Sequence, residues 1–269
     1  DYDFENGTVL QRVQVNNSFG SIYGFKYKGV YQYNDYDPSR PDATCPIVRD
    51  ANGNPIFDAQ GNTKPMYFAY GTSSAYEFKG GDAIYEDINH DGSIDELDIV
   101  YLGNSLPKIN GGFGFTFRFG KGFSINTFFN YRVGNKVVNK ARMEAENMYT
   151  NSNQSVAVNW RWRKEGDITE MPRALYNYGY NWLGSDRYVE DASFLRFKYL
   201  TVNYSLPKEL LKPVGLNQAS LYLSFQNIAC LTKYTGVDPE VGYGGMSVAT
   251  DGAKTPRSKD ILLRLRLGF

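Results

Sequence analysis

Histidine and cysteine are scarce in this sequence, and much of enzyme and metal chemistry depends on them. The 269 residues include one histidine, His90, and two cysteines, Cys45 and Cys230, which lie far apart and form no CxxC pair. A Ser-His-Asp triad, an HExxH zinc site or a histidine-rich iron site would each depend on that one histidine. A disulfide scaffold and a cysteine-based zinc site are not expected either.

An excess of charge of one sign is absent as well. Lysine plus arginine and aspartate plus glutamate each number 29, so the formal net charge is zero. A dedicated nucleic-acid-binding protein would need a basic surplus to hold phosphates, and an acidic disordered chain would carry net negative charge. The composition therefore predicts a folded protein with no nucleic-acid partner.

Long apolar runs and a leader segment are also missing. No apolar run reaches the roughly 18 residues that suggest a membrane-spanning helix. The first residues, DYDFENG, lack the basic and apolar regions of a signal peptide. We expect either that a signal has been removed or that the chain is the tail of a longer protein.

Aromatic residues and glycine are abundant instead, with 22 tyrosines, 17 phenylalanines, 3 tryptophans and 27 glycines. Several segments alternate between apolar and mostly polar residues, which is the period-2 pattern of β-strands with two different faces. The clearest are residues 113–119, 123–133, 219–226 and 261–269, and the less regular ones are 8–15, 22–33 and 192–205. In the last segment the apolar phase slips near Tyr199-Leu200, which predicts a β-bulge.

The connections between these seven predicted strands alternate between short and long. Residues 34–110, 134–191 and 232–256 are long connections, whereas Gly120-Lys121-Gly122 has the composition of a hairpin turn. Transmembrane β-barrels show this alternation, with tight periplasmic turns and long extracellular loops, and their strands need roughly 9–11 residues. The sequence therefore predicts an all-β fold, an antiparallel transmembrane β-barrel segment with long extracellular loops.

The two faces of the predicted strands also suit a barrel in a membrane. Phenylalanine and leucine line one face, and the other face carries Arg118, Arg132, Arg264 and Arg266. In a bacterial barrel the apolar face would contact lipid and the arginine-bearing face would line a water-filled lumen. Patterning alone also fits a soluble β-sandwich with one solvated face.

The number of predicted strands indicates part of a larger barrel. If the last strand, which ends at Phe269, runs inward, the loops 34–110, 134–191 and 232–256 are extracellular. Seven is an odd number, bacterial single-chain barrels have even numbers, and lipid tolerates no open sheet edge. We therefore predict that residues 1–269 are the C-terminal part of a transmembrane β-barrel, which other residues complete.

Residues 87–98 fit the twelve-residue calcium-binding loop of EF-hands. The candidate metal ligands are Asp87, Asn89, Asp91, Asp95 and Asp98, together with the backbone carbonyl of Ser93. Gly92 permits the sharp turn, and Ile94 could anchor the loop in a core. We predict a structural cation site, with Ca²⁺ favoured over Mg²⁺ because the loop offers six or more oxygen ligands.

Two departures separate this loop from an EF-hand. The twelfth position is Asp98 rather than glutamate, which shortens its reach for bidentate binding, and the flanking segments do not resemble paired helices. An aspartate- and asparagine-rich turn that is satisfied by its own backbone would have the same composition. His90 is at the outward-pointing fourth position and is expected to be solvated.

Seven segments together resemble the C-terminal portion of SusC/RagA-type TonB-dependent outer-membrane transporters of the Bacteroidetes. They are GSIYGFKYKGVYQ (20–32), GDAIYEDINHDGSIDELDIVYLGNSLPKINGGF (81–113), VGNKVVN (133–139), RWRKEGD with MPRA (161–174), VEDASFLRFKYLTVNYSLP (189–207), FQNIACLTKYTGVDPE (225–240) and LLRLRLGF (262–269). The combination, in this order and spacing, is highly specific. The calcium-type loop matches the family pattern DxNxDGxID at Asp87, Asn89, Asp91, Gly92 and Asp95.

This resemblance implies a barrel of about 22 strands with an N-terminal plug and a TonB-contacting segment. It also implies a bacterial outer-membrane location, a SusD-like surface lipoprotein that lids the extracellular mouth, and import of oligosaccharides or peptides. The chain would supply part of the barrel wall in the lipid bilayer and three extracellular loops, and the plug is expected outside it. The terminal Phe269 resembles the outer-membrane assembly signal.

Two other functions fit parts of the sequence. A secreted calcium-dependent carbohydrate-binding β-domain would be soluble without detergent and would bury its apolar face in a core. A secreted glycosidase could use carboxylate pairs such as Glu144 and Glu146 or Glu165 and Asp167, although nothing in their spacing places two of them across a cleft. No catalytic residue is predicted, so the protein is not expected to be an enzyme.

Overall fold

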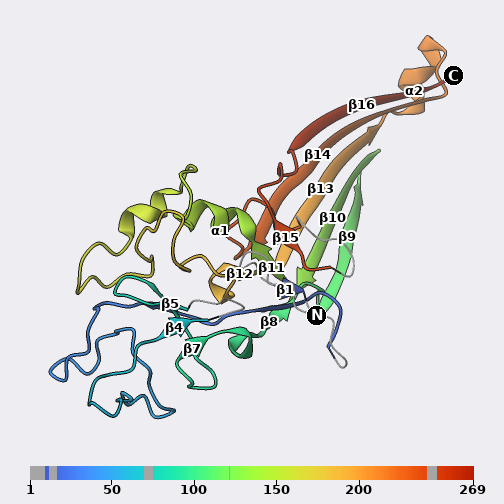
Figure 1. Cartoon of the computed structure of the whole chain (residues 1–269). Helices are drawn as coiled ribbons and strands as arrows, with labels where there is room; N and C mark the ends of the chain where they lie inside the picture. Colours follow the sequence, from blue (N-terminus) through green and yellow to red (C-terminus); the bar gives the residue numbers. More distant parts are fainter. Residues whose placement is uncertain (1–9, 12–16, 70–74, 121, 241–246) are drawn as a thin grey trace. The chain divides into compact units, whose positions relative to one another are not determined.

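The computed structural model of the chain describes residues 10–11, 17–69, 75–120, 122–240 and 247–269. The chain divides into two units. The first, here called the loop unit, contains residues 1–105, 138–190 and 242–252, and the second, the sheet unit, contains residues 106–137, 191–241 and 253–269. Figure 1 shows the chain coloured by sequence, with α1, α2 and many of the strands labelled.

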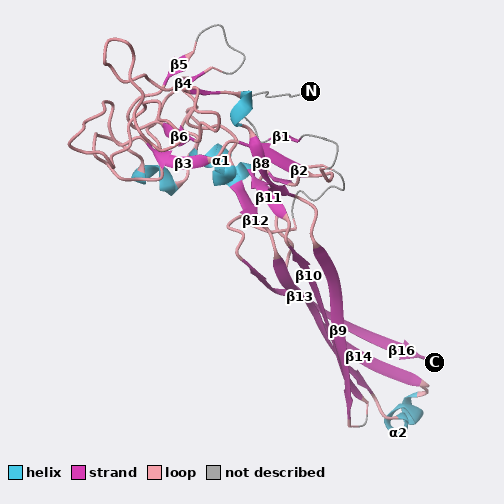
Figure 2. Cartoon of the chain, turned by 90° about the horizontal axis from the view of Figure 1, so that it is seen from below, coloured by secondary structure: helices cyan, strands magenta, loops and turns pink. Residues whose placement is uncertain are grey.

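The sheet unit is built on five long strands that form one antiparallel sheet (Figure 2). The strands are β9 (Ile109–Phe119), β10 (Phe123–Val133), β13 (Phe194–Ser205), β14 (Gln218–Thr232) and β16 (Asp260–Gly268). Their order across the sheet is β16-β14-β13-β10-β9. Five of the seven predicted strands are thereby confirmed, because regular alternation lets each strand pair along its length and keep two distinct faces.

The predicted β-bulge lies in β13. The pairing of β13 with β14 shifts between Phe197 and Tyr199, and its pairing with β10 shifts at the same place. Phe197 and Leu200 therefore share one face of the sheet although they are three residues apart, since their partners on β10 are Phe129 and Thr127. The extra residue restores the apolar phase that the sequence appeared to lose.

The predicted strand 22–33 does not join the long sheet, and this prediction is wrong. Its residues form two short strands, β2 (Ser21–Gly24) and β3 (Tyr27–Val30), which pair with β8 (Val100–Asn104) and β6 (Ala83–Tyr85). All four residues of β2 are buried, whereas a strand in the barrel wall would have one face toward lipid. Of the predicted strand 8–15, only Leu10–Gln11 lie within the described residues, and they form β1, which pairs with β2.

The remaining strands and helices of the described chain are short, and loops connect them. The small sheets have the orders β1-β2-β8, β3-β6, β5-β4-β7 and β12-β11-β15. Their other strands are β4 (Tyr67–Phe68), β5 (Tyr76–Glu77), β7 (Ser93–Ile94), β11 (Lys136–Asn139), β12 (Val189–Asp191) and β15 (Thr250–Asp251). The helices are α1 (Lys140–Glu146), α2 (Lys208–Leu211) and the 3₁₀ helices η2 (Glu96–Asp98), η3 (Val156–Trp160), η4 (Asp186–Tyr188) and η5 (Lys212–Val214). Within the described ranges, none of the helices has the length and apolar character to cross a membrane.

Aromatic residues fill the core of the loop unit, where Phe25, Phe78 and Tyr85 are buried together. Ile94 of the calcium-type loop belongs to the same cluster, so the predicted anchor is present. The fully buried Asp82 carboxylate lies in this unit and accepts hydrogen bonds from Arg173 Nε at 2.7 Å and from Tyr76 Oη at 2.8 Å. Because this buried charge has partners, the core tolerates it.

Candidate functional site

One face of the five-stranded sheet is apolar across its whole width. The register places Phe117, Ile125, Val202, Leu223 and Leu263 in a single row, with one residue from each strand. Phe117 is 55% exposed and Leu263 is 71% exposed. A row of large apolar side chains that is left uncovered suits contact with lipid rather than with water.

The opposite face is polar. Arg118, Ser124, Asn203, Tyr222 and Arg264 form the neighbouring row, again with one residue from each strand. Further along this face Thr201 and Ser224 share a hydrogen bond of 2.8 Å. The side chains of this face can exchange hydrogen bonds with water or with a hydrophilic solute, as expected of a wet barrel lumen.

Aromatic rings gather at the hairpin end of the apolar face. The rings of Phe123 and Tyr204 stack at 4.3 Å, and those of Phe119 and Phe123 stack at 6.1 Å. Aromatic residues concentrate where barrel strands leave the hydrocarbon region. This group therefore fits an aromatic girdle at one edge of the lipid-facing surface.

An ion network occupies the polar face near the other end of β13. The buried Arg196 guanidinium pairs with Asp238 at 2.5 Å and with Glu240 at 2.9 Å. Glu240 also pairs with Arg257 at 3.4 Å, and Asn130 donates a 3.5 Å hydrogen bond to it. The network ties the segment that follows β14 to the lumen face of the sheet. Sequence reasoning missed it, and the only available signals were an arginine in the polar phase of 192–205 and the acidic pair in VDPE.

The calcium-type loop is organised around the Asp98 side chain, which is fully buried. Its two oxygens accept hydrogen bonds from the backbone N–H groups of Ile88 at 2.7 Å and Asp95 at 3.0 Å, and Asp95 caps η2. Burial raises the pKa of Asp98 to about 6, and the nearby Asp87 and Asp95 carboxylates act in the same direction against those two hydrogen bonds. The loop therefore crowds negative charge that a cation would relieve.

The other predicted ligands follow the loop in Asx-type turns. One Asp87 oxygen accepts from Gly92 N–H at 2.9 Å, and the other oxygen is buried without a hydrogen-bond partner. Asn89 accepts from Asp91 N–H at 3.1 Å, and Asp91 accepts from Ser93 N–H at 2.8 Å. Across the described ranges, no three His, Cys, Asp or Glu side chains converge closely enough to hold a metal ion. The donor types and the unpartnered Asp87 oxygen fit a hard cation, while the metal site itself remains a prediction.

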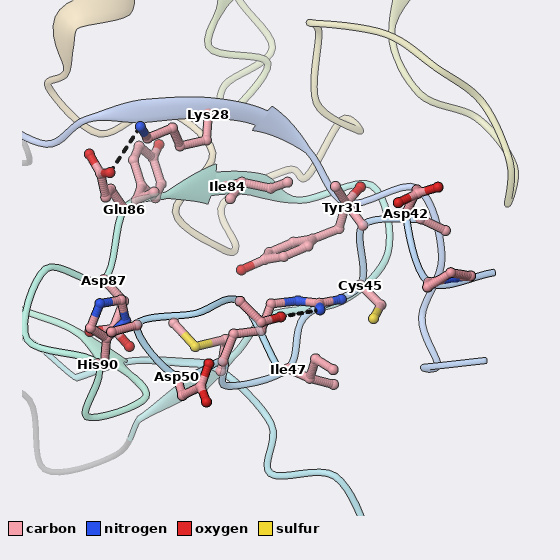
Figure 3. Close-up of a pocket in the computed structure, with 18 residues that line it drawn as sticks. Lys28, Tyr31, Asp42, Cys45, Ile47, Asp50, Ile84, Glu86, Asp87 and His90 are labelled. Carbon is pink, nitrogen blue, oxygen red and sulfur yellow. Dashed lines mark hydrogen bonds and ion pairs between the residues drawn. The ribbon is translucent and has the colours of Figure 1, made fainter. Parts of the chain in front are cut away.

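A cavity of about 460 Å³ adjoins this loop (Figure 3). Asp87 and His90 lie next to each other on one wall, and Lys28 and Glu86 form an ion pair of 2.9 Å on another. The buried thiol of Cys45 also lines the cavity and is free, and burial raises its pKa. The lining combines both signs of charge with apolar side chains and has no reactive thiolate, so nothing in it favours nucleophilic chemistry.

Known outer-membrane receptors are similar to this chain along almost its whole length. The chain is 30% identical to TonB-dependent receptor P39 of Formosa agariphila, over 99% of this chain and 26% of that receptor. It is 28% identical to TonB-dependent receptor SusC of Bacteroides thetaiotaomicron, over 100% of this chain and 22% of that receptor. The chain is homologous to SusC-type TonB-dependent receptors. It spans about a quarter of their length, and no family model matches it.

Solved structures of a SusC-type protein share the fold. The RagAB peptide importer in its "closed-closed" state aligns with a TM-score of 0.61 at 23% identity, over 100% of this chain and 25% of that chain. The RagAB peptide transporter aligns with a TM-score of 0.60 at 24% identity. The five strands are therefore a segment of an antiparallel β-barrel in the bacterial outer membrane. The alternative of a secreted β-domain is wrong, because it requires the apolar face to be enclosed in a core.

The SusC-type receptors are not enzymes, and the carboxylates considered for glycoside hydrolysis have other partners here. Glu165 accepts hydrogen bonds from the backbone and side-chain nitrogens of Asn34, which hold its pKa below the usual value. Glu146 is buried between Arg142 and Arg187, and Asp167 accepts from two backbone N–H groups of its own turn. These carboxylates stabilise the loop unit, and the chain is not an enzyme.

Proposed function

We propose that this chain forms part of the barrel wall and extracellular loops of a receptor that imports oligosaccharides or peptides across the outer membrane. The observation that carries this proposal is the sheet in which strand pairing places an exposed apolar face opposite a polar face. In the receptor, the plug and the TonB-contacting segment come from the remaining three quarters of the length, and TonB supplies the energy. A SusD-like lipoprotein covers the extracellular mouth.

The polar face would act as a weak, repeated binding surface. Arginine, asparagine, serine and tyrosine side chains offer donors and acceptors at regular spacing along the strands. Each single hydrogen bond adds only about 0.5–1.5 kcal/mol, because the solute exchanges it against a bond with water. A hydrophilic solute can therefore enter, move along the wall and leave again without being trapped.

Uptake measurements test the import function. Cells that carry the receptor should accumulate a fluorescently labelled oligosaccharide mixture or a labelled peptide mixture, and cells without the receptor should not. Accumulation should also stop when TonB is removed, because transport is energised from the inner membrane. Equal uptake of both mixtures with and without the receptor would contradict the proposal.

We also propose that residues 87–98 bind one structural Ca²⁺, with Mg²⁺ as the alternative ion. Asp87, Asn89, Asp91, Asp95 and Asp98 would supply side-chain oxygens, and Ser93 would supply its backbone carbonyl. The buried Asp87 oxygen without a hydrogen-bond partner supports this assignment. A bound ion would hold a long extracellular loop in one conformation, ready for its partner.

Removing the ion should loosen this loop without unfolding the barrel. An ion present at about 100 times its Kd stabilises the closed loop by about 2.7 kcal/mol, so chelation should raise proteolysis between residues 75 and 105 roughly 100-fold. The Asp91→Asn variant should be cleaved there without chelator. The matched control is Asp50→Asn, since Asp50 caps a similar turn, accepting from Asn52 and Asn54, outside the ligand set. Unchanged cleavage after chelation would count against the ion.

A further inference from the structure

A pocket opens on the apolar face of the sheet at the ends of β10, β13 and β14 that lie away from the hairpin turn. It measures about 720 Å³. Its apolar lining includes Phe113, Tyr131, Leu195 and Leu231. Tyr131 pairs with Leu195 and Leu195 pairs with Leu231, so these three residues form one row of the lipid-facing wall. The pocket is therefore a hollow within that wall.

A missing side chain creates room for this hollow. Gly111 is the partner of Tyr131 on β9 and leaves the outermost place in the row empty. The Tyr131 ring leans over Gly111, and a Cβ atom there would lie 2.9 Å from the Tyr131 hydroxyl. With the ring tilted toward β9, the space beside Leu195 and Leu231 stays open. Phe113, whose ring stacks on that of Phe129 at 5.2 Å, lines the pocket as well.

Beyond the row of Tyr131, Leu195 and Leu231, the residues that line the pocket become polar. Ser193 and Asp191 precede β13 and Lys233 follows β14, and all three line the pocket. Asp191 accepts a 2.8 Å hydrogen bond from Ser193 N–H. The charged side chains that line the pocket are Arg132, Asp191 and Lys233, so the lining carries two cations against one anion. Such a change from apolar to basic residues marks the headgroup level of a membrane.

We propose that this pocket binds a phosphate-bearing lipid of the outer leaflet, with an acyl chain beside Leu195 and Leu231 and the phosphate near Lys233. The inference rests on the proposed membrane placement, which puts this end of the sheet at the extracellular surface. The apolar hollow is continuous with the lipid-facing wall, and its basic rim complements an anionic headgroup. A soluble anion would gain nothing from the apolar part of the pocket, and a neutral lipid would gain nothing from its cationic side chains.

Lipid retention by the intact receptor tests this inference. The receptor is extracted from outer membranes in mild detergent, and bound lipid is measured by native mass spectrometry and by phosphorus analysis. The wild-type protein should retain a phosphate-bearing lipid after extensive washing. Leu231→Trp fills the hollow and should abolish retention, whereas Lys233→Glu should lower it about five-fold or more, since a lysine at the membrane surface contributes about 1 kcal/mol.

The matched control is Leu265→Trp, which makes the same change on the same face of the sheet but outside the pocket. It should retain lipid like the wild type. Equal retention by the wild-type, Leu231→Trp and Lys233→Glu proteins, or phosphorus without an acyl chain, would overturn the inference. Uptake by the same strains separates this result from the import proposal, because a receptor that transports normally but retains no lipid contradicts only the pocket.

Discussion

The Phe115→Arg variant is expected to assemble poorly and to lose about 2–4 kcal/mol of unfolding free energy, the cost of an arginine on the lipid face near the bilayer midplane. Phe115 is in a row with Thr127, Leu200, Phe225 and Ile261. This row lies between the aromatic girdle and the row that contains Tyr131. Unfolding by denaturant in lipid vesicles, together with the amount of receptor in the outer membrane, measures the effect.

The adjacent Thr116→Arg variant is the control, because it introduces the same side chain on the opposite face of β9. Thr116 donates a 2.9 Å hydrogen bond to Asn126, so its replacement should cost only about 0.5–1.5 kcal/mol. Arginine is already present on this polar face at Arg118. If both variants lost the same stability, the assignment of one face to lipid and the other to water would be wrong.

The Arg196→Ala variant is expected to lose about 3–5 kcal/mol, the usual cost of removing one partner from a buried ion pair. The Asp238 and Glu240 side chains are only 5% and 7% exposed, so water cannot replace the guanidinium without local opening. Because these residues tie the segment after β14 to the sheet, that segment should become accessible to protease. Denaturant unfolding and limited proteolysis of the purified receptor measure the two effects.

The Arg257→Ala variant provides the comparison within the same network. Its side chain is 47% exposed and pairs with Glu240 at 3.4 Å. An exposed pair of this kind contributes about 0–1 kcal/mol, so the variant should resemble the wild type in both measurements. A loss as large as that of Arg196→Ala would mean that the network is not organised around Arg196.

The Phe115 and Thr116 variants test one feature, the separation of an apolar and a polar surface by one layer of backbone. A side chain that points outward must be compatible with hydrocarbon, and the next one along the strand must be compatible with water. The proposed lipid pocket depends on the same separation, since it is formed where the outward row lacks a side chain at Gly111. Stability, lipid contact and the proposed passage of solutes thus depend on one sheet.

The sequence alone was sufficient to predict the five long strands, the bulge in β13 and the composition of each face. Alternation is a local property of a strand, and it is regular here because each face meets a single environment along its whole length. The donor set of the calcium-type loop was also visible in the sequence, because its ligands lie within twelve consecutive residues. Whether those donors hold an ion remains a prediction.

Tertiary structure decided the rest. The segment 22–33 alternates much like a barrel strand, yet β2 is buried on all sides in the loop unit, and no local pattern distinguishes these two fates. The ion network of Arg196 with Asp238 and Glu240 joins residues more than 40 positions apart, and the Tyr131–Gly111 contact depends on strand register. Period and composition are set residue by residue along the chain, whereas pairing and enclosure depend on which distant segments meet, and that is why only the folded structure could specify them.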